Sequence, residues 1–198
     1  WTTPEELSKA PNSFRHTKHM MEFFERELGV PYPWAKYGQV AVQDYHWGGM
    51  ENTSLTTLNY KTLFGSDTEN LFSSDSLVAH ELAHQWFGDL VTCKDWSHIW
   101  LNEGFATFYD WLWQGALHGR NETLYALHQA AKGILSNTNE TRGIVWRKFA
   151  EANDVAIKQA LWIALANGFF GAVYEHTVAA KVDQVICAAL IVDHCVLR

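Results

Sequence analysis

The spacing of apolar residues near the N-terminus predicts an amphipathic helix over residues 13–28. Asn12 or Ser13 can cap the start of this helix, and Gly29 can end it. The apolar side chains that recur near helical spacing are Phe14, Met21, Phe24 and Leu28. One face of the helix is therefore expected to pack against a core.

Two β-rich segments follow this helix. Residues 37–42 alternate as a strand does, and residues 54–60 form a second run of strand-favouring residues. Between them lies the segment Gly48-Gly49-Met50-Glu51-Asn52. Its two glycines allow the backbone to approach a ligand closely, although composition alone favours a plain hairpin turn.

Helical patterns dominate the chain after the strands. One helix is expected over roughly 76–87, with Asp75 as its N-cap and Gly88 as its stop. Two more are expected over about 97–117 and 121–135. Short N-terminal strands followed by mostly helices predict an α+β domain.

The composition changes near Val155. Residues 155–198 are rich in Ala, Val and Ile and carry few charges, which predicts two apolar helices over 155–167 and 171–192. We therefore expect residues 1–154 to form a domain core, and residues 155–198 to form a divergent apolar helical tail of the same domain.

The strongest chemical signal is the segment His80-Glu81-Leu82-Ala83-His84. On a helix, His80 and His84 project from one face about one turn apart and can hold one Zn²⁺. Glu81 then points at a metal-bound water, and Glu103 follows far enough downstream for a second helix to offer a third ligand. Two His and one Glu leave a fourth zinc position open, which is typical of catalytic zinc.

Composition excludes several other kinds of site. Cys93, Cys187 and Cys195 lack the paired spacing of structural zinc ligands and imply no disulfide framework. The formal net charge is −7 and basic residues do not cluster, so a nucleic-acid partner is not expected. No membrane segment is expected either. The compartment stays unknown, although few cysteines and no N-terminal signal pattern favour the cytoplasm.

Three motifs together closely resemble the gluzincin zinc aminopeptidases, the family of the aminopeptidase N and leukotriene hydrolase type. They are Gly48-Gly49-Met50-Glu51-Asn52, His80-Glu81-Leu82-Ala83-His84-Gln85-Trp86-Phe87-Gly88, and Trp100-Leu101-Asn102-Glu103-Gly104-Phe105-Ala106. Their order and the gap from His84 to Glu103 also agree with the family. The resemblance covers about residues 12–150 and is poor beyond them.

The resemblance implies a thermolysin-like zinc peptidase catalytic domain with one Zn²⁺ per chain. His80, His84 and Glu103 would bind the metal, and Glu81 would be the general base. The activity implied is a zinc metalloaminopeptidase that removes the N-terminal residue of a peptide by means of a zinc-activated water.

The resemblance also implies how substrate and product groups are held. The segment Gly48-Gly49-Met50-Glu51-Asn52 would lie along the substrate as an edge strand, and Glu51 would bind the free α-amine of a peptide. Tyr174, in Tyr174-Glu175-His176-Thr177, best matches the family's oxyanion-donor tyrosine, although the Lys-Gly that follows it in the family is His-Thr here. The alternative is a tyrosine packed between apolar helices.

Family members also carry an N-terminal β-rich domain and a C-terminal helical domain, which do not fit in 198 residues. The chain is therefore expected to be a catalytic-domain fragment of a larger enzyme. The alternative function is a metal-binding but catalytically impaired fragment. Action on another substrate, such as an epoxide, and a thermolysin-like endopeptidase are further possibilities.

Overall fold

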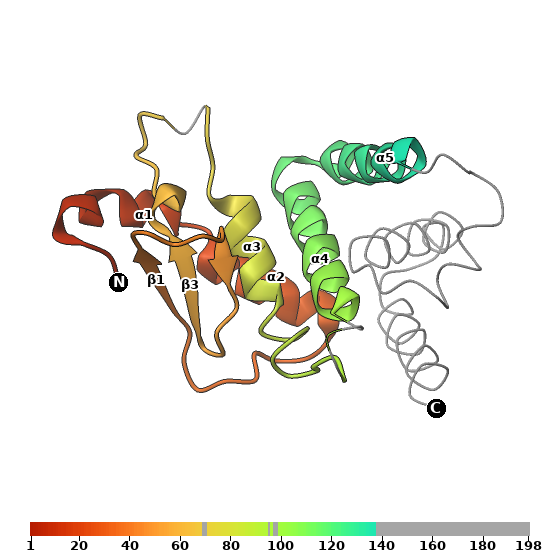
Figure 1. Ribbon diagram of the computed structural model, residues 1–198, viewed down its shortest axis with the longest axis horizontal. Helices are drawn as coiled ribbons and strands as arrows, with labels where there is room; N and C mark the ends of the chain where they lie inside the picture. Colours follow the sequence, from red (N-terminus) through yellow and green to blue (C-terminus); the bar gives the residue numbers. More distant parts are fainter. Residues whose placement is uncertain (69–70, 95, 97–98, 138–198) are drawn as a thin grey trace.

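The computed structural model describes residues 1–68, 71–94, 96 and 99–137 (Figure 1). A small sheet and several helices are present, as the sequence predicts. The strands are β1 (Gly38–Val42), the short β2 (Gly49–Met50) and β3 (Leu55–Asn59). The helices are η1 (Pro4–Lys9), α1 (Ala10–Ser13), α2 (Thr17–Leu28), η2 (Tyr60–Thr62), α3 (Asp75–Ala83), α4 (Trp100–His118) and α5 (Arg120–Asn137).

The sheet has the strand order β1-β3-β2. β1 runs parallel to β3, with Gly38 opposite Leu55, and β2 runs antiparallel to β3, with Met50 opposite Thr57. Within the described residues β2 is thus an edge strand, and the turn that joins it to β3 closes with a hydrogen bond from the Leu55 amide to the Asn52 carbonyl, 2.8 Å. The glycines Gly48 and Gly49 do not form that turn, so the hairpin-turn alternative is wrong for them.

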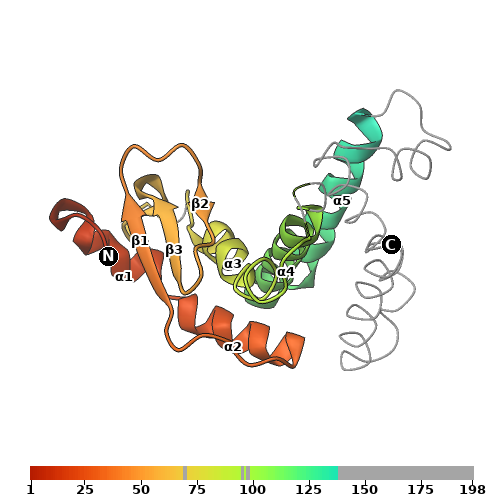
Figure 2. The same ribbon diagram turned by 60° about the horizontal axis from the view of Figure 1, so that its bottom comes forward.

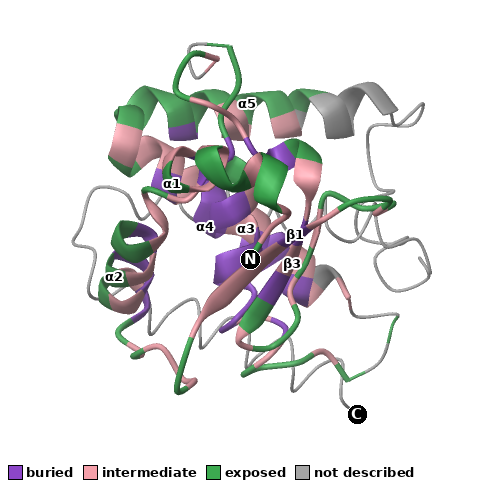
Figure 3. Ribbon diagram, turned by 90° about the vertical axis from the view of Figure 1, so that its left-hand side faces the viewer, coloured by how far each residue is buried: buried purple, intermediate pink, exposed green. Residues whose placement is uncertain are grey.

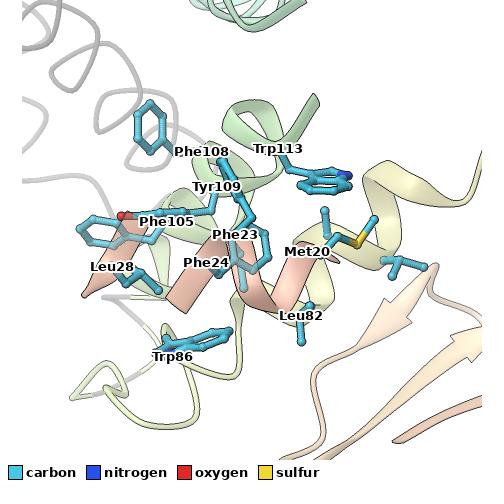
Figure 4. Close-up of a cluster of buried hydrophobic side chains, with 14 of the residues drawn as sticks. Met20, Phe23, Phe24, Leu28, Leu82, Trp86, Phe105, Phe108, Tyr109 and Trp113 are labelled. Carbon is cyan, nitrogen blue, oxygen red and sulfur yellow. The ribbon is translucent and has the colours of Figure 1, made fainter. Parts of the chain in front are cut away.

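Helix α3 lies between the sheet and α4, and α2 packs against α3 (Figure 2). Buried residues gather on α3 and α4, whereas the outer face of α5 is exposed (Figure 3). The core where these elements meet is rich in aromatic rings (Figure 4). Its members include Met20, Phe23, Phe24, Leu58, Val78, Leu82, Trp86, Phe105, Tyr109 and Trp113. Burial of these side chains is the main force that holds α3 in place.

The first predicted helix is shorter than expected. Residues 14–16 form a turn after the short helix α1, and α2 starts only at Thr17. Neither Asn12 nor Ser13 caps α2, because both side chains bond the backbone of Phe64 instead, over 3.1 Å and 2.7 Å. The predicted end is confirmed, since Gly29 adopts the left-handed φ of 66°.

The helix over 76–87 also differs at both ends. Asp75 is its first residue rather than its N-cap, because the Asp75 carboxylate is held by His16 Nδ1 at 3.0 Å. The regular helix ends at Ala83, where the last turn tightens to shorter-range bonds such as Gln85 N–H to Leu82 C=O, 3.1 Å. Gly88, with φ of 132°, stops the segment as predicted.

The predicted helices over 155–167 and 171–192 lie outside the described residues, as does the proposed boundary at residue 154. Among the described residues, none of the helices is both long enough and apolar enough to cross a bilayer.

Phe24 is the centre of the aromatic core and gives a stability test. Its ring is fully buried and meets Phe23, Trp86 and Tyr109 edge-on, with ring centroids 5.6, 6.1 and 5.9 Å apart. We expect Phe24→Ala to lower the free energy of unfolding by about 3–5 kcal/mol, measured by urea denaturation. Tyr125→Ala, at a 61% exposed position, should change it by about 0.5 kcal/mol or less. Equal effects would contradict this core.

Candidate metal centre and cleft

Three side chains from α3 and α4 converge on one point. His80 lies on α3 and His84, the C-cap of that helix, follows one turn later; their Nε2 atoms are 3.1 Å from one another. Glu103, in the first turn of α4, places Oε2 3.2 Å from His80 Nε2 and 3.5 Å from His84 Nε2. The structure therefore brings together the three predicted metal ligands.

The far side of each imidazole has its own partner. His84 Nδ1–H donates to the Phe87 carbonyl over 2.9 Å, which leaves the lone pair of Nε2 facing the centre. His80 Nδ1 lies 3.5 Å from Thr107 Oγ1, and Thr107 is one turn beyond Glu103 on α4. Such outer partners orient imidazoles for a metal.

The charges around this point favour a cation. Burial alone would raise the pKa of Glu103, but its hydrogen bonds with His80 and His84 outweigh this and hold the pKa well below its ordinary value. Burial lowers the pKa of His84, but the hydrogen bond with Glu103 and the charges of Glu51 and Glu103 raise it to about 9. Two imidazole nitrogens and one carboxylate also form a donor set that zinc prefers, so the residues fit this metal.

Glu81 lies beside the cluster and is almost fully buried. Burial raises its pKa to about 7, which the positive charges of His80 and His84 counteract in part. Its Oε2 has no hydrogen-bond partner among the described residues. Gly49 of β2 passes so close that an added Cβ would lie 2.6 Å from Glu81 Cγ and overlap the carboxylate. Glycine is therefore required at position 49.

The edge strand β2 forms one wall of a cleft of about 1130 Å³ that contains the cluster. Gly48, Gly49, Met50 and Glu51 line this cleft, and Glu51 Oε1 lies 4.0 Å from His84 Nδ1. Asn52 is not part of the lining. Its side chain instead accepts a hydrogen bond from Thr57 of β3, 2.8 Å.

Several residues of the site had no assigned role from the sequence. Gln85 is fully buried and contacts the segment that carries Glu51. Asn102 accepts a hydrogen bond from the Cys93 amide, 3.2 Å, and Asp110 accepts one from Ser76 at the cleft wall, 2.6 Å. Thr107 follows Glu103 at helical spacing, which is a usable signal, but the others become visible only when distant segments meet. Tyr174 lies outside the described residues.

Comparison with known proteins gives a consistent family assignment. Residues 12–156 match the model of the peptidase family M1 domain. The chain is 38% identical over 123 residues to endoplasmic reticulum aminopeptidase 1 of Homo sapiens, and 38% identical over 118 residues to aminopeptidase N of Canis lupus familiaris. The structure of native yeast LTA4 hydrolase matches with a TM-score of 0.60 at 27% identity, over 71% of this chain and 22% of that chain.

The chain spans only a small part of these relatives. The match covers 60% of this chain and 13% of the human protein, and 57% of this chain and 12% of the canine protein. The family of the domain is thus shown, whereas the activity of the larger relatives is not carried over by the match alone.

The cluster predicts tight binding of one zinc ion that depends on Glu103. We expect Glu103→Gln to weaken zinc affinity by about 100-fold or more, because the amide removes the anionic ligand. Competition with a chromophoric chelator would measure this. Glu22→Gln is the matched control, since Glu22 is exposed on α2 and lies far along the chain from the cluster. Unchanged affinity in Glu103→Gln would show that Glu103 is not a ligand.

Proposed function

Because this chain belongs to peptidase family M1, we propose that it holds the catalytic core of a zinc aminopeptidase, which cleaves the N-terminal residue from peptides. The gluzincin resemblance predicted from the three motifs is confirmed by the family match. The observation that carries the proposal is one cleft in which the cluster of His80, His84 and Glu103 adjoins both Glu81 and Glu51.

The proposal includes a thermolysin-like arrangement, with residues 1–154 as the core and residues 155–198 as a divergent tail of the same domain. The whole enzyme would carry flanking N- and C-terminal domains. The family match over residues 12–156 and the 12–13% coverage of the relatives support this division.

Zinc, one ion per chain, would be held by His80, His84 and Glu103. Zinc supplies Lewis acidity at such a site, so that water becomes a nucleophile at neutral pH. The buried carboxylate of Glu81 would take the proton of the attacking water and pass it to the leaving amine, a role that its unpartnered oxygen supports.

Glu51 would determine where the peptide is cut. Its carboxylate lies in the cleft wall, 4.0 Å from His84 Nδ1, so it can pair with the ammonium of a substrate. An ammonium held there places the first peptide carbonyl near the metal and excludes longer N-terminal extensions. The edge strand β2 would align the peptide alongside it by strand addition. Tyr174 is proposed as the second oxyanion donor on the family pattern alone.

The first experiment is hydrolysis of alanyl- and leucyl-anilides, with N-acetylated versions alongside. We expect cleavage of the free-amine substrates only, because acetylation removes the positive charge that Glu51 binds. Activity should be lost on chelation and restored by zinc. Cleavage of the N-acetylated substrates at equal rates would indicate an endopeptidase instead. Zinc uptake by a folded chain without turnover would indicate the catalytically impaired fragment.

A second prediction concerns Glu81→Gln. The amide has the same shape but cannot accept the proton, so kcat should fall by about 10²–10⁴-fold. Zinc content should stay the same, because this change leaves the proposed ligands His80, His84 and Glu103 intact. Glu22→Gln should retain full activity. An active Glu81→Gln enzyme would remove Glu81 from the role of general base.

A further inference from the structure

Gln85 immediately follows the metal-binding His84, and its side chain is fully buried. Both ends of its amide are hydrogen-bonded. Nε2–H donates to the Glu51 carbonyl over 3.2 Å, and Oε1 accepts from the Ser54 amide over 2.8 Å and from the Tyr32 hydroxyl over 3.2 Å. The side chain thus forms hydrogen bonds with two backbone groups of one short segment.

That segment, residues 51–54, joins β2 to β3 and begins with Glu51. Neither backbone group that Gln85 holds takes part in the β2–β3 pairing, which covers Gly49 and Met50 only. Ser54 has a positive φ of 64°, so this segment needs outside support to keep its shape. At the tip of the segment, Thr53 forms a hydrogen bond with Asp89. The contact that holds Glu51 itself is the one from Gln85.

We propose that Gln85 is a positioning residue that sets the distance between Glu51 and the metal-binding histidines, and thereby the recognition of the substrate ammonium. This inference rests on the proposed aminopeptidase function. Gln85 follows His84 directly in the chain, and its side-chain amide bonds the backbone of Glu51. The backbone of the residue that would bind the substrate ammonium is therefore held by the neighbour of a predicted metal ligand.

An amide is the side chain that this place requires. One end must donate to a carbonyl and the other must accept from an N–H and a hydroxyl, which no aliphatic side chain can do. A carboxylate would lose the donor and add a buried negative charge near Glu51 and Asp89. A bonded, fully buried amide also has few alternative positions, so it holds the Glu51 backbone within a narrow range.

The test is Gln85→Met, which keeps side-chain length and burial but removes all three side-chain hydrogen bonds. We expect KM for alanyl-anilide to rise about tenfold, since a small misplacement of a binding group has effects of this order or larger. The kcat value should stay within about threefold, and zinc content should not change. Trp34→Phe is the matched control, because it removes the hydrogen bond to the Gln85 backbone carbonyl, 3.2 Å, but leaves the three side-chain hydrogen bonds of Gln85 in place.

A double-mutant cycle with Glu51→Ala separates positioning from a general structural effect. If Gln85 acts through Glu51, Gln85→Met should raise KM no further once the Glu51 side chain is gone. An equal KM increase in both backgrounds would overturn the proposal, as would an unchanged KM in Gln85→Met alone.

Two further outcomes keep this test distinct from that of the proposed function. If the unaltered enzyme cleaves free-amine and N-acetylated substrates equally, the proposed function fails and not only the role of Gln85. If Gln85→Met does not fold, Tyr32→Phe removes one hydrogen bond from the same amide, together with the bond of the Tyr32 hydroxyl to the Lys36 carbonyl, 3.0 Å. It should then raise KM about two- to fivefold in the Glu51 background only; no change would overturn the proposal.

Discussion

The packing of α3 against α4 is the constraint on which the site depends. The ring of Phe87, just beyond α3, stacks on Phe105 and Tyr109 of α4, with centroids 4.5 and 5.3 Å apart. Phe105 is two residues from Glu103, so this aromatic contact also fixes how closely the Glu103 carboxylate approaches His80 and His84. Apolar burial thus sets the geometry of a polar cluster.

Charge explains why that cluster needs a cation. Glu51, Glu81 and Glu103 lie around two imidazoles in a partly buried cleft, where charges are costly unless they are paired. The pKa of Glu103 is lowered and that of Glu81 is raised, because Glu103 is paired more fully than Glu81. Glu103 is held ionised by two histidines, whereas Glu81 is buried without a full set of partners. One carboxylate suits a ligand, and the other suits a group that exchanges protons.

The convergence of His80 and His84 could be predicted from the sequence because it rests on helical spacing, which brings the two side chains to one face in any regular helix. Glu103 required the motif as well, since the sequence does not give the angle between α3 and α4. Helix starts were predicted less well. Ser13 and Asp75 have good capping chemistry, but tertiary partners, Phe64 and His16, take their side chains. The role of Gln85 had no sequence signal, because its partners come from segments 31 to 53 positions away.

Two contacts that matter for specificity join β2 and the turn after it to α3 and to the residues just beyond that helix. Gly49 passes against Glu81, and Glu51 is held through Gln85. The strand that would align the peptide and the helix that would hold the metal therefore form one unit. If the proposed function holds, the register of cleavage at one residue is a property of this unit alone. Other domains could then change which side chains are accepted, without altering the position of the cut.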